Sequence, residues 1–301
     1  MDSHALPLTI RILVNFGLAY DVSSDGADFL LYIHPAKTAQ QNVQSESLLV
    51  AQTTEQMVIH TEPMTGNRCV RLRASAGPLT LSYQASVDLK HHSADPLKLE
   101  ESSVWNLPQH VLPYLFPSRY CPSDRLLKLA GREFGHIAKG YGRVEAIREW
   151  VWRRIAFTSN TSNAHTSAID TLIEQVGVCR DFAHLMIALC RALNIPARIV
   201  TGTDYGANPV LGPPDFHAYV EAWVGDRWYI FDPSGTAVPM GLIRIATGRD
   251  AADVAFATIF GSVVTGSPLI AAEAILDVAA GIELPRHTPL ALSTHNGVEF
   301  T

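Results

Sequence analysis

The chain has 301 residues, of which 47% are hydrophobic and 17% charged, so it is long enough for two ordinary domains or one large one, and general disorder is excluded. Its 23 basic and 29 acidic residues give a net charge of -6 with no long block of either sign, which argues against nucleic acid as a partner. The first residues, MDSHALPLTIRILV, lack a basic segment followed by an apolar one, so we expect no secretory signal.

The four cysteines show no CxxC pair and no metal-ligand spacing; they are Cys69, Cys121, Cys179 and Cys190. This usage is typical of a reduced protein, so we expect a cytoplasmic location, with no cofactor and no metal.

Short segments of alternating polarity fill the first part of the chain, and turn-forming stretches such as SSDGAD separate them. This pattern predicts a small antiparallel β domain. Its expected strands are residues 8–14, 29–34, 67–74 and 79–85.

A proline-rich stretch of weak periodicity, residues 87–124, is interpreted as the linker to a second domain. We therefore divide the chain into an N-terminal β-rich domain, residues 1–105, and a core, residues 106–301. The core shows helical periodicity first and strand-like segments such as 197–203 afterwards, which is the order of an α+β fold.

Helix boundaries in the core are indicated by capping residues. Ser123 is a candidate N-cap, residues 142–157 carry apolar side chains near helical spacing, and Ser167 begins a short helix that stops at Gly177. The uncharged run from Val254 to Ala272 contains two glycines and a proline, so we expect buried strands and turns there, and no membrane partner.

Cys179 stands in EQVGVCRDFAHLMIALCRAL, residues 174–193, where a glycine-containing turn becomes a helix. Apolar residues recur after it at helical spacing, which predicts a helix with one buried side that includes Cys190. Cys179 itself falls in the first turn, where free N–H groups and the positive end of the helix dipole stabilise a thiolate. The position suits a nucleophile, although a lone cysteine more often only fills space at a helix start.

Two alternating runs, 217–224 and 227–232, flank Gly225-Asp226, a two-residue connection suited to a tight hairpin. In that register His217 and Asp232 lie diagonally on one face, so an imidazole and a carboxylate can meet. A three-residue loop would send them to opposite faces.

Nucleophilic acyl transfer requires three groups that this sequence supplies: a thiol at a helix start, a histidine and a carboxylate. The base takes the thiol proton, the carboxylate orients the ring, and the backbone N–H of the nucleophile holds the oxyanion. His184 is the rival base, but five residues along a helix amount to about 500° of rotation, so we interpret it as a structural histidine. Asp181 is a candidate acceptor for N–H groups of the first turn.

GVCRDFAHLMIALCRALNIPARIVTG and DFHAYVEAWVGDRWYIFDPSG resemble the core of the transglutaminase-like superfamily, whose fold is related to that of papain. The β-rich first part is similar to the N-terminal region of bacterial members, and PSRYCPSD and GRDAADVAFATIFG also resemble their pattern. The resemblance implies a papain-like core with helices packed on an antiparallel sheet. It also implies a triad with Cys179 as nucleophile, His217 as general base and acid, and Asp232 as the orienting carboxylate.

Animal transglutaminases carry a tryptophan shortly after the nucleophile and need calcium, whereas Arg180 and Asp181 follow here and no acidic loop has calcium-loop spacing. We therefore expect a peptidase or amidase that acts on a peptide or protein amide. The loop TDYGANPVLGPPDF, residues 203–216, leads into His217 and is a candidate substrate-contacting segment.

Three alternatives stay open. The first is protein-glutamine transglutaminase activity, in which an amine resolves the thioester. The second is a non-catalytic interaction module, whose natural signature would be a broken triad. The third makes Cys179, His217 and Asp232 ligands of zinc. The oligomeric state is also open.

Overall fold

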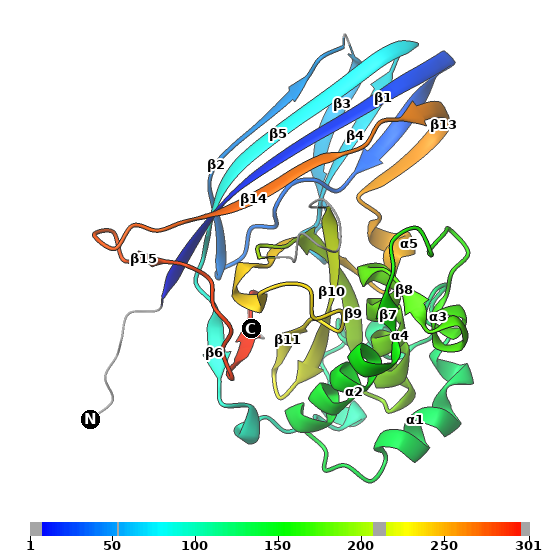
Figure 1. Cartoon of the computed structure of the whole chain (residues 1–301), viewed down its shortest axis with the longest axis vertical. Helices are drawn as coiled ribbons and strands as arrows, with labels where there is room; N and C mark the ends of the chain where they lie inside the picture. Colours follow the sequence, from blue (N-terminus) through cyan, green and yellow to red (C-terminus); the bar gives the residue numbers. More distant parts are fainter. Residues whose placement is uncertain (1–7, 53, 207–214, 296–301) are drawn as a thin grey trace.

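The computed structural model describes residues 8–52, 54–206 and 215–295. An eight-stranded sheet lies at one end of the molecule, and the helices gather around a separate four-stranded sheet at the other end (Figure 1). Residues 207–214, the middle of the loop expected to contact substrate, lie outside the described residues.

The first sheet is built around β1 (Thr9–Leu31), which is central and antiparallel to most of its neighbours. Side chains of β1 alternate between core and surface, with Ile10, Ile12 and Val14 buried. The order is β2-β5-β1-β4-β3, with β2 (Gln41–Val50), β3 (Thr54–Thr61), β4 (Arg68–Ala74) and β5 (Gly77–Leu89). The expected antiparallel β domain is confirmed, and two of its strands, β2 and β3, were missed.

The stretch SSDGAD is a bulge within β1, so the expected turn there is wrong. The pairing of β1 with β13 (Ala257–Thr265) shifts register between Val22 and Ala27, and Gly26 has a φ of 74°. The strand continues because β4 pairs with β1 from Ala27 to Leu31.

The C-terminal strands return to the first sheet, which departs from the expected division at residue 105. β13 (Ala257–Thr265) and β14 (Leu269–Ile275) pair antiparallel with β1, and β15 (Ile282–Glu283) pairs parallel with it. Most of their side chains are exposed or half-buried, so the expected burial of this run is wrong. Within the described ranges, no helix is long and apolar enough to cross a membrane.

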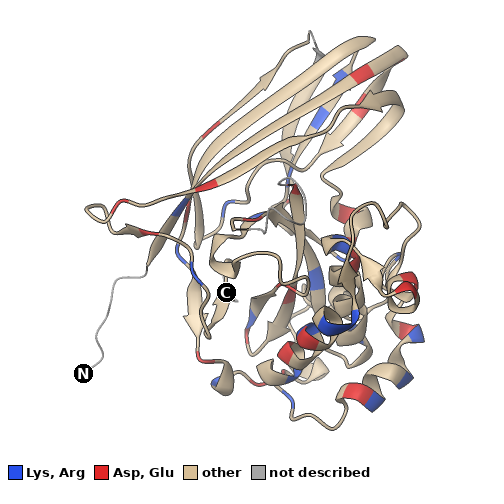
Figure 2. Cartoon of the chain, in the orientation of Figure 1, with Lys and Arg blue, Asp and Glu red and all other residues tan. Residues whose placement is uncertain are grey.

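The second unit has the predicted α+β composition, with helices against an antiparallel sheet of order β11-β10-β9-β12. Basic and acidic residues are interspersed along α1 (Leu127–Phe134) and α2 (Tyr141–Arg154) (Figure 2). The strands are β9 (Ala197–Thr203), β10 (Phe216–Val224), β11 (Arg227–Phe231) and β12 (Ile243–Gly248). The helices are α1 (Leu127–Phe134), α2 (Tyr141–Arg154), α3 (Ala168–Glu174), α4 (Cys179–Ala192) and α5 (Ala251–Val254).

Short elements complete the described chain. β7 (Ala156–Phe157) pairs parallel with β8 (Val176–Gly177), and β6 (His92–Ala94) pairs antiparallel with β16 (Ala291–Ser293). The 3₁₀ turns are Pro96–Lys98, Val104–Asn106, Leu112–Leu115, Ser123–Arg125 and Pro239–Gly241. Ser123 therefore starts a 3₁₀ turn and not α1, whereas Ser167 caps α3 as predicted, with Asp170 accepting its N–H.

Helix α4 is the centre of the second unit and is buried on all sides from Asp181 to Ala192. The helix is confirmed, but its burial is not one-sided because sheet, helices and connecting segments surround it. Its polar side chains have internal partners. Asp181 accepts the Val178 N–H, His184 accepts the Ala251 N–H, and Arg191 donates to the Ala197 carbonyl.

Two carboxamides of the first unit attach it to the open edge of β12. Gln41 donates to the Arg244 carbonyl (2.7 Å) and accepts the Arg244 N–H (2.9 Å), and Asn67 pairs in the same way with Thr247 (2.8 and 2.9 Å). Each side chain imitates a strand backbone, so the edge of the second sheet is covered by the first unit.

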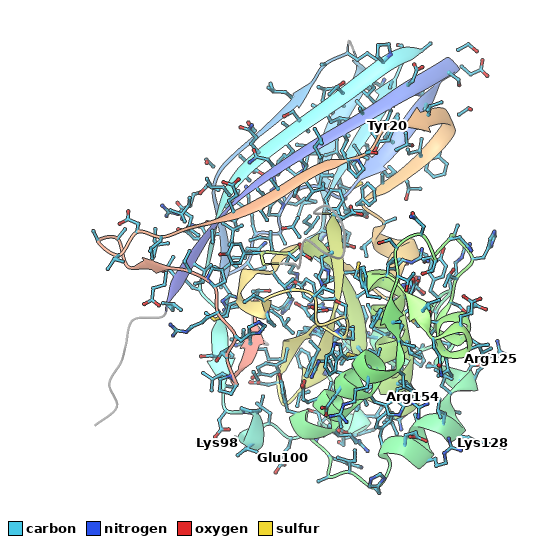
Figure 3. The ribbon with its side chains drawn as sticks, viewed as in Figure 1. Tyr20, Lys98, Glu100, Arg125, Lys128 and Arg154 are labelled. Atoms are coloured by element: carbon cyan, nitrogen blue, oxygen red, sulfur yellow. The ribbon has the colours of Figure 1, made fainter. Side chains whose placement is uncertain are left out.

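The connecting segment that carries Lys98 and Glu100 runs along the opposite end of the molecule from Tyr20 in the first sheet (Figure 3). Its carbonyl at Glu100 accepts the Gly225 N–H (2.8 Å), and the Ser102 hydroxyl donates to the Gly225 carbonyl. The segment therefore secures the turn of the β10–β11 hairpin.

Candidate active site

Cys179 is the first residue of α4, and Val178 before it has extended backbone (φ −108°, ψ 176°). The Val178 N–H donates to Asp181 Oδ2 (2.9 Å), and Ser162 Oγ donates to Asp181 Oδ1 (2.9 Å). Asp181 therefore caps the helix as predicted, but it accepts the N–H of Val178, which precedes the helix, and not an N–H of the first turn. The Cys179 thiol is half-buried and lies 4.0 Å from the carbonyl oxygen of Phe216, the first residue of β10.

The β10–β11 hairpin has the predicted register. Val224 pairs with Arg227 around the Gly225-Asp226 turn, and Gly225 has a φ of 63°. His217 Nε2 consequently lies 3.4 Å from Asp232 Oδ1, with both side chains only 3% exposed. The expected meeting of imidazole and carboxylate is confirmed.

The turn that follows β11 holds the Asp232 carboxylate. Oδ1 accepts hydrogen bonds from the N–H (3.0 Å) and hydroxyl (2.6 Å) of Ser234, and Oδ2 accepts one from the Ala237 N–H (3.1 Å). Burial opposes the charged carboxylate, but His217 and these donors outweigh it, so the pKa of Asp232 is lowered. Asp232 is therefore an ionised and oriented group beside the imidazole.

His217 is 4% exposed, and burial alone would favour its neutral form. The neighbouring Asp232 carboxylate, followed by the Cys179 thiol, outweighs burial and raises the pKa of His217 well above its ordinary value. Cys179, His217 and Asp232 therefore form one electrostatic cluster at the junction of α4, β10 and the end of β11.

A second carboxylate, which the sequence did not single out, faces the same imidazole. Asp204 Oδ2 lies 3.5 Å from His217 Nδ1, and burial raises the pKa of Asp204. His217 pairs with Gly202 in the ladder between β10 and β9, so Asp204, two residues on, is its diagonal neighbour. The alternation of side chains along the two strands would have predicted this contact if the pairing of β9 with β10 had been known from the sequence.

The rival base His184 is remote from this cluster. It is buried, its Nε2 accepts the Ala251 N–H (3.2 Å), and its ring stacks on Tyr120 at 5.0 Å between centroids. Desolvation lowers the pKa of His184 well below its ordinary value. The structural role expected for it is confirmed.

Arg180 does not point freely into solvent. Its guanidinium donates to Ser162 Oγ (2.6 Å) and to the Asn163 carbonyl (2.7 Å), which holds it against the loop before α3. Among the other thiols, Cys121 and Cys190 are fully buried, and burial raises the pKa of Cys121 to about 12. These thiols are structural.

A cavity of about 400 Å³ lies beside the cluster, between the first turns of α4 and the loop after Asp232. Its walls include Trp152, Phe157, Phe182 and Gly235. A second hollow of about 530 Å³ includes Asp232 itself and shares Gly235 and His287 with the first. In the part of the chain that the structure describes, no three His, Cys, Asp or Glu side chains group closely enough to hold a metal ion.

Two family models match the sequence. Residues 129–233 match the model described as transglutaminase-like superfamily, and residues 10–110 match the model described as bacterial transglutaminase, N-terminal domain. A crystal structure from Cytophaga hutchinsonii, described as a "putative cysteine protease", is 39% identical with a TM-score of 0.86, over 95% of this chain and 97% of that chain.

Curated relatives match a shorter part. An uncharacterized protein of Mycobacterium leprae is 30% identical over 146 residues, 47% of this chain and 52% of that protein. An uncharacterized protein of Mycobacterium tuberculosis is 30% identical over 125 residues, 37% of this chain and 40% of that protein. The matched part of the chain thus spans about half the length of these relatives or less.

Proposed function

The chain belongs to the transglutaminase-like superfamily, and we propose that it is a cysteine peptidase or amidase that cleaves an amide bond through a thioester on Cys179. His217 is the general base and acid, and Asp232 orients its ring. The substrate is a peptide or protein amide. The Cytophaga hutchinsonii relative supports this choice, because it is described as a cysteine protease, which is the same reaction class.

The observation that carries the proposal is one imidazole with a carboxylate at Nε2 and the Cys179 thiol among its electrostatic partners. His217 Nε2 lies 3.4 Å from Asp232, and the thiol that contributes to the raised pKa of His217 is on the first residue of a helix. A carboxylate beside an imidazole favours the imidazolium form, and a helix N-terminus favours the thiolate. Both effects favour transfer of the thiol proton to His217.

The first half of the reaction forms the thioester. The Cys179 sulfur attacks the carbonyl carbon, the S–C bond forms, and the oxyanion lies near the N–H of Cys179, which has no acceptor within its helix. The C–N bond then breaks while His217 gives its proton to the leaving amine. The products of this half are a free amine and an acyl group on Cys179.

The second half releases the acyl group. His217 takes a proton from water, the oxygen attacks the thioester carbon, and the C–S bond breaks to give a carboxylic acid and the thiol. A primary amine in place of water would give a new amide, which is transglutaminase activity. We favour water because it requires no second binding site.

The first experiment measures the rate of iodoacetamide alkylation against pH, with the modified cysteine identified by mass spectrometry. Wild type is compared with His217→Ala and with His184→Ala, the matched control for loss of a buried imidazole. We expect Cys179 to react rapidly below pH 7, to react more slowly in His217→Ala, and to be unaffected in His184→Ala. Alkylation that rises only near about pH 8.5 in all three proteins, as for a free thiol, would refute the proposal.

A peptide mixture is then incubated with wild type or Cys179→Ala, with and without a biotin-labelled primary amine. Cleavage products that depend on Cys179 and carry no label support hydrolysis. Label in the products would replace the peptidase assignment with transglutaminase activity. Reactive Cys179 with neither outcome would favour the interaction module.

A further inference from the structure

The imidazole of His217 lies between two carboxylates. Asp232 Oδ1 is 3.4 Å from Nε2, and Asp204 Oδ2 is 3.5 Å from Nδ1. The side chains of His217, Asp232 and Asp204 are 3%, 3% and 11% exposed, so water screens these charges weakly. Orientation of the ring requires one acceptor, and Asp232 already supplies it.

Asp204 occupies the side of the ring from which the proton must move. Because Asp232 lies at Nε2, the nitrogen left to exchange a proton with the Cys179 thiol is Nδ1, and Asp204 faces that nitrogen. The carboxylate and a thiolate would therefore compete for the same N–H. This arrangement differs from a triad, in which the reacting nitrogen faces the nucleophile alone.

We propose that Asp204 is a positioning residue that sets the pH range in which Cys179 and His217 exchange a proton. The inference rests on the proposed function, since it assigns a role within the same site. The charged and titratable groups that face His217 are Cys179 on α4, Asp204 after β9 and Asp232 after β11, with Tyr219 of β10 stacked nearby at 6.4 Å. Asp204 is in turn influenced by Asp232 and Asp215.

The sign of the effect follows from the charge of Asp204. The pair loses one proton when the thiol ionises beside the imidazolium, and a second when the imidazolium is neutralised. A nearby negative charge disfavours the thiolate, which raises the first apparent pKa, and it favours the imidazolium, which raises the second. Asp204 therefore moves both proton losses of the pair to higher pH.

Asp204→Asn tests this because the amide keeps the shape of the side chain and removes its charge. The alkylation rate of Cys179 is measured from about pH 4 to about pH 10, a range that spans the ordinary His and Cys values. The thiolate reacts in both charge states of the imidazole, so the rate rises in two steps with pH. We expect both steps to shift down by about one pH unit, as for loss of a charge within contact distance. Asp204→Glu, which keeps the charge, is expected to stay closer to wild type than Asp204→Asn.

Asp215→Asn is the matched control, since Asp215 is exposed, lies at the same end of the sheet and makes no ion pair with His217. It should shift the two steps of the profile less than Asp204→Asn does. Thermal unfolding verifies that each variant is folded, and Asp204→Ser provides a second neutral side chain if the asparagine variant does not fold.

The outcomes separate this inference from the proposed function. Unchanged steps in the alkylation profile of Asp204→Asn, or a shift equal to that of Asp215→Asn, would overturn the role of Asp204. His217-dependent alkylation would still support the triad in that case. A downward shift in a protein that cleaves no amide would support Asp204 and count against the peptidase. Alkylation of Cys179 that does not depend on His217 would overturn both the proposed function and the role of Asp204.

Discussion

Gly177 lies directly against Asp181, the residue that caps the helix carrying Cys179. A β-carbon on Gly177 would stand 2.7 Å from the β-carbon of Asp181 and 3.1 Å from its Oδ2. Asp181 has little freedom to move, because Val178 and Ser162 both donate to its carboxylate. Position 177, two residues before Cys179, therefore requires a glycine, because any β-carbon there would clash with Asp181.

Gly177→Ala is expected to destabilise the fold by about 1 to 3 kcal/mol, as for an overpacked core, and to slow alkylation of Cys179 by displacing the start of α4. Chemical denaturation and the alkylation rate measure the two effects. Gly142→Ala in α2 is the control, because a β-carbon added there would meet no atom within 4 Å outside its own helix, and it should be neutral or stabilising by up to about 1 kcal/mol. Wild-type reactivity in Gly177→Ala would contradict this account.

The hairpin that unites His217 and Asp232 could be predicted because its register depends on two adjacent residues. Gly225 and Asp226 allow a two-residue turn, and alternation then determines which side chains share a face. The start of α4 could be predicted for the same reason, because the residues that determine it, Gly177, Cys179 and the apolar repeat, lie within one short stretch of sequence.

Partners that are distant in the chain could not be predicted in this way. Alternation in residues 257–275 indicates strands, but it does not identify β1 as the strand with which they pair. Asp204 was missed for the same reason, because the loop between β9 and β10 is too long to determine the register. The SSDGAD stretch has the composition of a turn, but it stays within a strand because β1 pairs with β4 and β13 there.

Gln41→Ala is expected to destabilise the protein by about 1 to 3 kcal/mol, because the Arg244 N–H loses a buried acceptor and two carbonyls lose a donor. The free energy of unfolding is measured with urea. Gln40→Ala is the neighbouring control, since the Gln40 side-chain oxygen has no hydrogen-bond partner within the described ranges, and it should change stability by less than about 0.5 kcal/mol. Equal effects of the two substitutions would show that the carboxamide of Gln41 does not secure β12.

Glu221→Gln is expected to cost about 3 to 5 kcal/mol, because it leaves buried arginines without their counter-charge. Glu221 is fully buried, its Oε2 lies 2.6 Å from Arg198, and its Oε1 lies 3.5 Å from Arg244. In contrast, Glu149→Gln breaks a pair with Arg153 in which both side chains are largely exposed, and it should cost about 0.5 kcal/mol or less. Similar losses in the two variants, measured by chemical denaturation, would be incompatible with this role of Glu221.

Asp232→Asn is expected to alter stability in a pH-dependent way. The lowered pKa of Asp232 means that its contribution is present above the unfolded value of about 3.9 and is lost as pH falls through the folded value. The raised pKa of His217 means that its contribution is present below the unfolded value of about 6.5 and is lost as pH rises through the folded value.

The stability difference between wild type and Asp232→Asn should therefore be largest between the two unfolded pKa values, from about pH 3.9 to about pH 6.5, at about 3 to 5 kcal/mol for a broken buried pair. It should shrink on both sides as the pH moves through each folded pKa. Urea unfolding over a pH series at constant ionic strength measures it. Asp226→Asn, which removes an exposed carboxylate at the hairpin turn, should give a small difference that varies little with pH. A difference for Asp232→Asn that stays constant with pH would mean that the carboxylate only fixes its own turn, through Ser234 and Ala237, and does not hold His217 in its charged form.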